Sequence, residues 1–278
     1  MDTLETTIAF LGAGNMARAI AGGLVRTGLV PSHRMVASDV SPAALAALES
    51  AVPGLRVAAG NAGAAAGADV VILAVKPWGV AEVCASIRDD IRPDTLVISI
   101  CAGITTAAIE AALRGDGGLS EPRVVRVMPN TPALIGAGSA ACAAGAHATD
   151  DDLQLAVRLF RSVGAAVAVT EDKLDLVTGL TGSGPAYVFR FLEALIAAGT
   201  ELGLTETEAR TLVPAMVLGS ARMAVESGRE LHELRDAVTT KGGTTEAGLR
   251  TLEEGDFMQL VHDAVAAATA RSRELRQS

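Results

Sequence analysis

The chain has 278 residues, of which 50% are hydrophobic, 20% are charged and only 3% are aromatic. This length suggests about two domains with a core that needs no disulfide or metal, and the composition excludes a mainly disordered chain. The formal net charge of −9 argues against a nucleic-acid partner, because binding to a phosphate backbone depends on clustered Lys and Arg side chains.

Membrane and secretion signals are not predicted. Mean hydropathy is high at +0.37, but the longest uncharged stretches, such as residues 132–149, are interrupted by Gly, Ser and His. Residues 1–7 are acidic and polar, unlike a secretory signal. Cys84, Cys101 and Cys142 lie far apart without a C-x-x-C pair, which is typical of free thiols in a reducing compartment. We therefore expect a cytoplasmic protein.

The first half of the chain alternates short apolar runs with helical segments. One helix is expected to run to about Thr27, and another to begin at Ser41 as the N-cap, with Pro42 at its first position. Buried strands separated by helices predict a parallel sheet covered on both faces. The candidate strands are residues 7–11, 35–38, 70–75, 96–100, 124–127 and 165–169.

Beyond Thr170 the sequence changes to long helical periodicity without strand-like runs. We therefore predict a domain of residues 1–169 that holds the sheet and an all-helical domain of residues 170–278. The expected helical segments are 174–203, interrupted at 182–185, then 206–227 and 230–239, with further helices from Thr244 and Phe257.

The first candidate strand leads directly into a G-x-G-x-x-A turn formed by Gly12, Gly14 and Ala17. In a dinucleotide site the first Gly permits the tight turn, the second lets the backbone approach a pyrophosphate, and the small third residue lets helix and strand pack closely. The strand–turn–helix context favours dinucleotide binding over an ordinary glycine-rich turn.

Asp39 ends the second candidate strand, where an acidic side chain can bind the adenosine 2′-hydroxyl of NAD. The neighbouring Ser38 and Ser41 could instead accept the 2′-phosphate of NADP, and Asp39 could simply be a solvated loop residue. The choice of cofactor stays open at this position.

Three further loops follow candidate strands and so belong to the edge of the sheet where ligands bind. Lys76 either binds phosphate or takes part in chemistry, or is a solvated turn residue. Cys101 has no adjacent His to act as its base, so we interpret it as a small buried residue. Pro129 and Pro132 make their loop rigid, as suits a site wall or a tight turn.

In the helical half, residues 239–245 precede the helix expected from Thr244 and offer backbone N–H groups, hydroxyls and a helix N-terminus. They could bind a carboxylate, or form an ordinary cap with a Thr at the N-cap. The four His residues lack metal-binding spacing, so no metal is expected, and no G-x-S-x-G motif supports hydrolysis.

Six segments occur in order over nearly the whole chain. They are FLGAGNMARAI (10–20), AVKPW (74–78), SICAGI (99–104), VRVMPNTPALIGAG (125–138), GLTGSGPAYVF (179–189) and LRDAV with GGTTEAGLRTLE (234–253). Together they resemble the pyrroline-5-carboxylate reductase family, and the last is more specific than the glycine turn.

The resemblance implies an α/β fold with an N-terminal Rossmann-like, doubly wound sheet, followed by an all-helical C-terminal domain that dimerises, often into rings of dimers. It implies reduction of L-1-pyrroline-5-carboxylate to L-proline, the last step of proline biosynthesis. The hydride donor would be NADPH, with NADH possible. A small-molecule substrate is implied, with no nucleic acid or membrane partner.

The family's motifs also imply cofactor contacts. The glycine turn would hold the pyrophosphate, the end of the second strand with Asn61 would meet the adenosine, and the loops at 74–77 and 100–102 would line the nicotinamide side. The implied residues are Gly12, Ala13, Gly14, Asn15, Met16, Ser38, Asp39, Asn61, Ala74, Val75, Lys76, Pro77, Ile100, Cys101 and Ala102.

The implied substrate contacts are Thr240, Gly243, Thr244 and Thr245, which would hold the carboxylate. Thr245 would also donate a hydrogen bond or a proton to the imine nitrogen. The chain departs from the family at Lys241, where a Pro is usual; the change either loosens the carboxylate loop or favours anions.

A second departure is Trp78, the only Trp, where Gln or a small residue is usual. It either narrows the cofactor cleft or packs outside it.

Two other functions fit the sequence less well. A 3-hydroxyacid dehydrogenase shares the architecture but carries a catalytic Lys shortly after a glycine-rich helix start, and residues 185–189 contain none. A cofactor-binding regulatory protein without turnover would have no need of the Gly-Gly-Thr-Thr segment.

Overall fold

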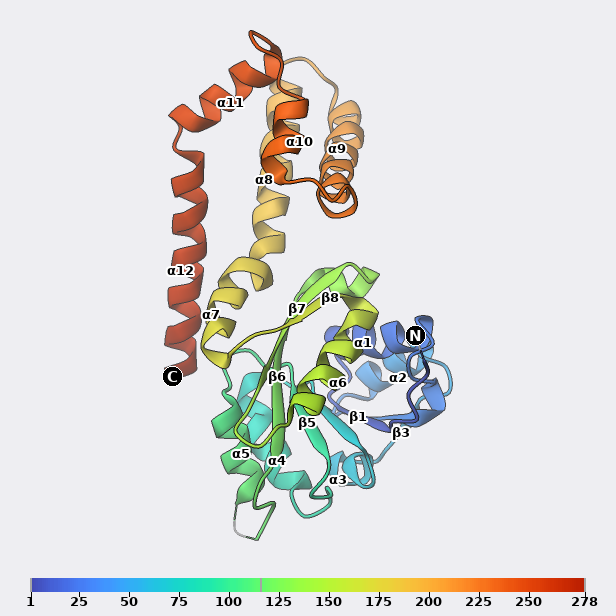
Figure 1. Cartoon of the computed structure of the whole chain (residues 1–278). Coiled ribbons are helices and arrows are strands. Elements are labelled where there is room, and N and C mark those ends of the chain that lie inside the picture. The colour runs from blue at the N-terminus through green and yellow to red at the C-terminus, as the bar shows by residue number, and fades with distance from the viewer. Residues whose placement is uncertain (1, 116, 278) are drawn as a thin grey trace. The chain divides into compact units, whose positions relative to one another are not determined.

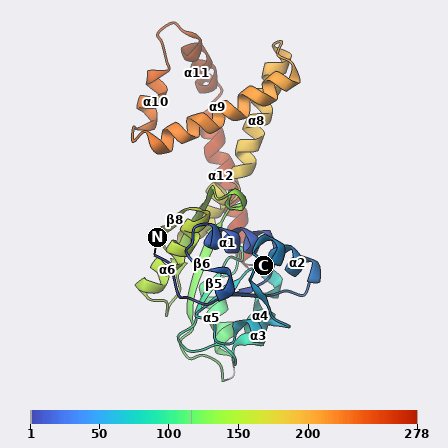
Figure 2. The ribbon, with the colours of Figure 1, turned by 90° about the vertical axis from the view of Figure 1, so that its right-hand side faces the viewer.

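The structure, a computed structural model, describes residues 2–115 and 117–277. It forms two compact units. One runs to Gly182 and takes in the chain again from Ala268, and the other is Ser183–Ala267 (Figures 1 and 2). Among the described residues, no helix combines the length and apolarity needed to cross a bilayer.

The first unit is built on a sheet that has eight strands within the described residues, in the order β3-β2-β1-β4-β5-β6-β7-β8 (Figure 1). The sheet order reverses between β1 and β4, and this switch point is where open α/β sheets bind ligands, beyond the carboxyl ends of the strands. The strands are β1 (Ile8–Leu11), β2 (Met35–Ser38), β3 (Arg56–Val57), β4 (Val70–Leu73), β5 (Leu96–Ser99), β6 (Arg123–Pro129), β7 (Gly138–Ala144) and β8 (Gly164–Ala168).

Helices cover both faces of this sheet, which confirms the predicted Rossmann-like layers. Alternate residues of β1 enter different cores: Ile8 and Phe10 pack with one set of helices, and Ala9 and Leu11 with the other. The first set is α1 (Asn15–Arg26), α2 (Pro42–Ala51) and α6 (Asp150–Phe160). The second set is α3 (Asn61–Ala65), α4 (Val80–Ile87) and α5 (Thr106–Arg114).

Two strands were not predicted. The strand β3 has only two residues, and β7 has the sequence GSAACAA, whose small residues have little intrinsic preference for a strand. The segment forms a strand because β7 lies between β6 and β8 and its backbone is hydrogen-bonded to both. We expected a parallel sheet, but β7 runs antiparallel to β6, so this part of the prediction is wrong. The Ser41 N-cap is confirmed, since its hydroxyl accepts from Ala44 N at 3.3 Å.

The chain after β8 stays in the first unit through a short helix η5 (Glu171–Lys173), α7 (Leu174–Val177) and a π-helix η6 (Thr178–Gly182). The carboxylate of Glu171 accepts from the N–H and the hydroxyl of Thr106, at 2.8 and 2.7 Å. The fully buried Arg126 of β6 also binds Glu171, at 3.3 Å. The last strand of the sheet therefore ends at Ala168, whereas the first segment of the compact unit continues to Gly182.

A second carboxylate, that of Asp175, explains why the unit also takes in the C-terminal part of α12 (Phe257–Gln277). The side chain of Asp175 is 1% exposed. It accepts a hydrogen bond from the hydroxyl of Ser272 at 2.9 Å and pairs with the guanidinium of Arg276 at 3.2 Å. These contacts hold the end of α12 against α7.

The second unit is helical throughout its described residues, as predicted. Its two long helices, α8 (Gly184–Glu201) and α9 (Glu206–Glu226), pack on each other (Figure 2). The unit also holds α10 (Leu231–Ala237), α11 (Thr244–Glu254) and the first part of α12. Large apolar side chains remain exposed in this single chain, including Leu218 at 63%, Met258 at 81% and Leu260 at 67%. Apolar exposure on this scale is typical of a protein–protein interface.

Candidate active site

The turn between β1 and α1 has the backbone that the glycine motif predicts. Gly12 has a φ of +105°, and a Cβ there would lie 2.5 Å from the carbonyl oxygen of Ala74, so only glycine fits. Gly14 is the N-cap of α1, and a Cβ on it would meet nothing within 4 Å. The open space over Gly14 leaves the start of α1 accessible to an anionic group such as a pyrophosphate.

A cavity of about 360 Å³ opens beside this turn. Its walls come from the residues that follow β1, β4 and β5 and from the end of β6, so it lies at the switch point of the sheet. The lining residues are Gly14, Asn15, Met16, Ala74, Val75, Lys76, Ile100, Ala102, Met128, Pro129, Thr131 and Leu134.

The cavity brings together most of the residues expected on the pyrophosphate and nicotinamide side. Lys76 is among them, and so is Pro129, which makes its loop a site wall. Pro77 and Cys101 do not line the cavity. Neither does Trp78, which is 83% exposed and so packs outside it.

Cys101 is a buried residue, as interpreted from the sequence, and is 3% exposed. Its thiol donates to the carbonyl oxygen of Val75 at 3.2 Å. Burial raises the pKa of this thiol above its ordinary value, so it stays protonated at neutral pH and is a poor nucleophile.

The residues expected at the adenosine end are connected by hydrogen bonds. The hydroxyl of Ser38 donates to Asn61 Oδ1 at 2.8 Å, and Asn61 Nδ2 donates to the hydroxyl of Ser86 at 3.2 Å. The carboxylate of Asp39 accepts from the backbone N–H groups of Ala13 and Ser41, both at 2.7 Å. Asp39 is therefore bound to the glycine turn itself and is not a freely solvated loop residue.

Thr240, Gly243, Thr244 and Thr245 lie in the second unit, within one turn and the start of α11. The N–H of Gly243 donates to the carbonyl of Thr240 at 2.8 Å, and Gly242 has a φ of +72°. This is a four-residue turn with its left-handed residue in third place, and the second place, where Pro is favoured, holds Lys241.

The helix α11 begins at Thr244 with Gly243 as its N-cap, so the alternative of a Thr cap is wrong. The two threonines instead occupy the first positions of the helix, where backbone N–H groups have no helical partner. Sequence reasoning missed Glu246, whose carboxylate accepts from the N–H of Gly242 at 2.6 Å. An acidic residue three places after an N-cap is the signal that would have suggested such a contact.

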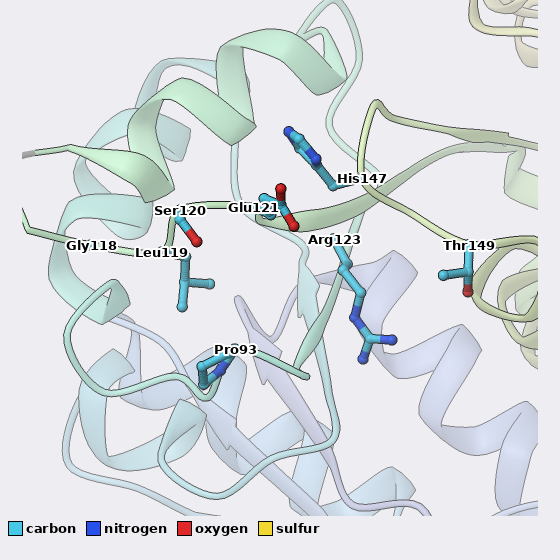
Figure 3. A pocket seen from close by; sticks show the side chains of 8 residues that line it. All are labelled: Pro93, Gly118, Leu119, Ser120, Glu121, Arg123, His147 and Thr149. Carbon is cyan, nitrogen blue, oxygen red and sulfur yellow. The ribbon is translucent and has the colours of Figure 1, made fainter.

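A larger cavity, of about 560 Å³, lies at the opposite edge of the sheet, where β6 begins (Figure 3). Figure 3 shows the Arg123 side chain turned away from His147, and Arg123 pairs with Asp152 at 3.2 Å. Because this edge holds the amino end of β6, it is not where an α/β sheet binds its ligand. Among the described residues, no group of three or more His, Cys, Asp or Glu could hold a metal ion.

Comparison with known proteins gives matches over nearly the whole chain. A family model described as pyrroline-5-carboxylate reductase dimerisation matches residues 171–275, and one described as NADP oxidoreductase, coenzyme F420-dependent, matches residues 7–103. The chain is 40% identical over 268 residues to pyrroline-5-carboxylate reductase from Methanosarcina acetivorans, covering 96% of this chain and 97% of that protein.

Two solved structures are similar over nearly their full length. A pyrroline-5-carboxylate reductase from Coxiella burnetii has a TM-score of 0.91 and 38% identity, covering 98% of this chain and 99% of that one. Pyrroline carboxylate reductase from Plasmodium falciparum, with NADP bound, has a TM-score of 0.82 and 29% identity, covering 99% and 100%.

Proposed function

This chain belongs to the pyrroline-5-carboxylate reductase family, and from that membership we propose that it transfers a hydride from NADPH to L-1-pyrroline-5-carboxylate and releases L-proline. The observation that carries the proposal is the cavity beside the Gly12–Gly14 turn. Its position at the switch point and the open space over Gly14 fit a dinucleotide.

In this proposal the N–H groups of Asn15 and Met16, at the start of α1, hold the pyrophosphate. Ser38 and Asn61 face the adenosine ribose, and the loops after β4 and β5 lie along the nicotinamide. The bound cofactor supplies the hydride, and the chain supplies its orientation. Support for NADPH comes from the relative that holds NADP.

The substrate is an anion with a carboxylate, and the start of α11 suits it. Thr240, Gly243, Thr244 and Thr245 would surround the carboxylate, which would accept from the threonine hydroxyls and from the N–H groups of Thr244 and Thr245 at the start of the helix, where no helical partner exists. The Thr245 hydroxyl would donate to the imine nitrogen. Lys241 adds a positive charge beside this turn, which favours an anionic ligand in a chain whose net charge is −9.

The reaction needs little acid–base chemistry from the protein. A protonated cyclic imine is already a good electrophile, so the barrier depends mainly on holding its carbon against the hydride donor. A cavity without a His or a carboxylate in its wall is therefore compatible with this chemistry.

We further propose a homodimer formed through the helical unit, in the cytoplasm, with rings of dimers as a further level of assembly. The exposed apolar side chains of α9 and α12 support an interface there. The match of residues 171–275 to a dimerisation model points to the same part of the chain.

The direct test is the oxidation of NADPH by the purified protein in the presence of pyrroline-5-carboxylate, followed by the absorbance of the reduced nicotinamide and by detection of proline. A 3-hydroxyacid with NADP is the parallel substrate. Turnover with the imine and none with the hydroxyacid is expected. The opposite pattern, or no turnover with either, would contradict the proposed function.

A further inference from the structure

The π-helix η6 ends with a backbone carbonyl that the helix itself cannot satisfy. The carbonyl of Thr181 would take its α-helical hydrogen bond from residue 185, which is Pro185 and has no N–H. The next donor along, the N–H of Ala186, is used by the carbonyl of Ser183 at 3.0 Å. A part-buried carbonyl in this position needs a donor from elsewhere in the chain.

Asn130, directly after β6, supplies that donor. Its Nδ2 donates to the carbonyl of Thr181 at 3.0 Å and to the hydroxyl of Ser139 at 2.9 Å. Its Oδ1 accepts from the N–H of Ser139 at 2.9 Å. A flipped amide would place nitrogen against an N–H and oxygen against a carbonyl, so the contacts admit a single orientation.

Asn130 lies one residue beyond the end pair of the β6–β7 ladder, Pro129 with Ala140, and Ser139 is the residue next to Ala140. The Asn130 side chain therefore closes the loop between the two strands through its contacts with Ser139. Within and beside that loop, Met128, Pro129, Thr131 and Leu134 all line the cavity.

The π-helix η6 packs against the same wall of the cavity. A Cβ on Gly182 would lie 2.8 Å from Cε of Met128, so η6 packs directly against a lining residue. Any shift of η6 relative to β6 would therefore move the side chain of Met128 in the cavity.

We propose that Asn130 is a positioning residue for hydride transfer, whose amide holds the cavity wall at residues 128–134 against the π-helix. This inference rests on the proposed function. It assigns to Asn130 no contact with substrate or cofactor. Its effect is to keep the wall in one arrangement, so that the nicotinamide and the imine meet at a fixed distance.

Asn130→Asp tests the amide with almost no change of shape. The new carboxylate still accepts from the N–H of Ser139, but it cannot donate to the carbonyl of Thr181 and repels it. We expect kcat to fall about tenfold or more, while the Kd for NADPH, measured by fluorescence, changes less than about threefold because the glycine turn is untouched. A deuteride donor should show a larger isotope effect on kcat than in the wild type.

Protonation should reverse the defect, because a carboxylic acid can donate to the Thr181 carbonyl. The ratio of variant to wild-type kcat is expected to rise as the pH falls from about 7 to about 5. The elements η6, η3 (Thr131–Ile135) and β7 carry no acidic or basic side chain other than the thiol of Cys142. The elements packed against these three carry the other charged groups of this region. They are Arg18 and Arg26 of α1, Arg123 and Arg126 of β6, Asp150, Asp151, Asp152 and Arg158 of α6, Arg161 of η4 (Arg161–Val163), Glu171, Asp172 and Lys173 of η5, and Asp175 of α7.

Ser139→Ala is the matched control. It removes the hydroxyl that Asn130 binds but keeps the backbone N–H, and kcat is expected to stay within about twofold of the wild type. The second test is a rescue: Pro185→Ala provides the missing N–H for Thr181, so Asn130→Ala should lose less activity in that background than alone. If Asn130→Asp does not fold, the comparison of Asn130→Ala with the Asn130→Ala/Pro185→Ala double variant tests the role of Asn130 in its place.

The outcomes separate the two proposals. An active wild-type enzyme whose Asn130→Asp and Asn130→Ala variants keep full kcat overturns the role of Asn130 and leaves the proposed function standing. An inactive wild-type protein overturns the proposed function. Hydrogen exchange then tests whether Asn130 holds the cavity wall. Faster exchange of residues 131–139 in Asn130→Ala than in the wild type supports this role, and unchanged exchange overturns it.

Discussion

The backbone N–H of Ala13 donates to the carboxylate of Asp39 at 2.7 Å. One of the N–H groups of the glycine turn is therefore already bound by the chain's own acidic residue, and the start of α1 is left for the cofactor. The same carboxylate lies at the end of β2, where the adenosine ribose of a dinucleotide binds. Asp39 fixes the turn, and we expect its negative charge to face the 2′-phosphate of a bound NADP.

We expect Asp39→Asn to raise the ratio of kcat/KM for NADPH to that for NADH by about fivefold to tenfold. The reason is the loss of a like-charge repulsion of about 1 kcal/mol at the 2′-phosphate. Asp69→Asn is the control, because Asp69 also binds a backbone N–H, that of Thr7, at the other edge of the sheet. An unchanged ratio in Asp39→Asn would show that the carboxylate does not meet the ribose.

Replacing Gly12 by Ala is expected to reduce stability, whereas replacing Gly14 by Ala is expected to weaken NADPH binding. Gly12→Ala places a Cβ 2.5 Å from the Ala74 carbonyl at a φ of +105° and should cost about 1–3 kcal/mol of unfolding free energy. Gly14→Ala has free space and should cost less than about 1 kcal/mol, yet weaken NADPH binding because the methyl group covers the start of α1. Urea unfolding and NADPH titration of both variants check this, and equal loss of stability in the two would contradict it.

Thr245→Ala is expected to lower kcat/KM for the imine about tenfold to a hundredfold, as a lost hydrogen bond to a reacting atom does, without changing the Kd for NADPH. Thr245→Ser keeps the hydroxyl and should recover most of the activity. Thr251→Ala, on the same helix with its hydroxyl bound to the carbonyl of Ala247, is the control. Wild-type kinetics in Thr245→Ala would remove this residue from the mechanism.

Asp175→Asn should destabilise the protein, because it leaves Arg276 without its charge partner beside a buried side chain. A broken buried pair costs about 3–5 kcal/mol, and the partial exposure of Arg276 reduces the expected loss to about 2 kcal/mol. Glu193→Gln, which breaks the exposed pair with Arg190, should change the unfolding free energy by less than about 0.5 kcal/mol. Equal midpoints for both variants in urea would refute the assignment.

The buried thiols predict a loss of stability in alkali. Burial raises the pKa of Cys84 and of Cys142 from 9.0 to about 12. Between these values the unfolded chain releases thiol protons that the native chain retains, so stability is complete below about pH 9 and falls as the pH rises towards 12. Each thiol contributes up to about 1.4 kcal/mol per pH unit in that window.

Urea unfolding at about pH 8 and about pH 10.5 measures this effect. The Cys84→Ala/Cys142→Ala double variant removes both thiols and should lose less stability between the two pH values than the wild type. Equal losses would assign the alkaline sensitivity to other groups.

The parts of the fold that are determined locally could be predicted from the sequence. Val70–Leu73 and Leu96–Ser99 are runs of branched apolar residues and form strands, and Gly12 forms the turn that its type and position require. The strand β7 could not be predicted in this way, because Gly138–Ala144 is poor in such residues and becomes a strand only through its two neighbours.

The same limit applies to the candidate site. The family resemblance implied Lys76 and Ile100 on the nicotinamide side, and both line the cavity at the switch point. The contact of Asn130 joins it to Thr181, 51 residues away, and no local pattern at Asn130 shows that partner. Pro185 is the one signal in the sequence, because a Pro in a helix leaves a carbonyl without its donor.

The end of α12 belongs to the same unit as the first strand, because Ser272 and Arg276 bind the buried Asp175. During synthesis the sheet emerges from the ribosome first, but the carboxylate of Asp175 has no partner until Ser272, 97 residues further along, has been made. We therefore expect the unit that holds the sheet to stay incomplete during synthesis until α12 has emerged, because an unpaired buried carboxylate destabilises it.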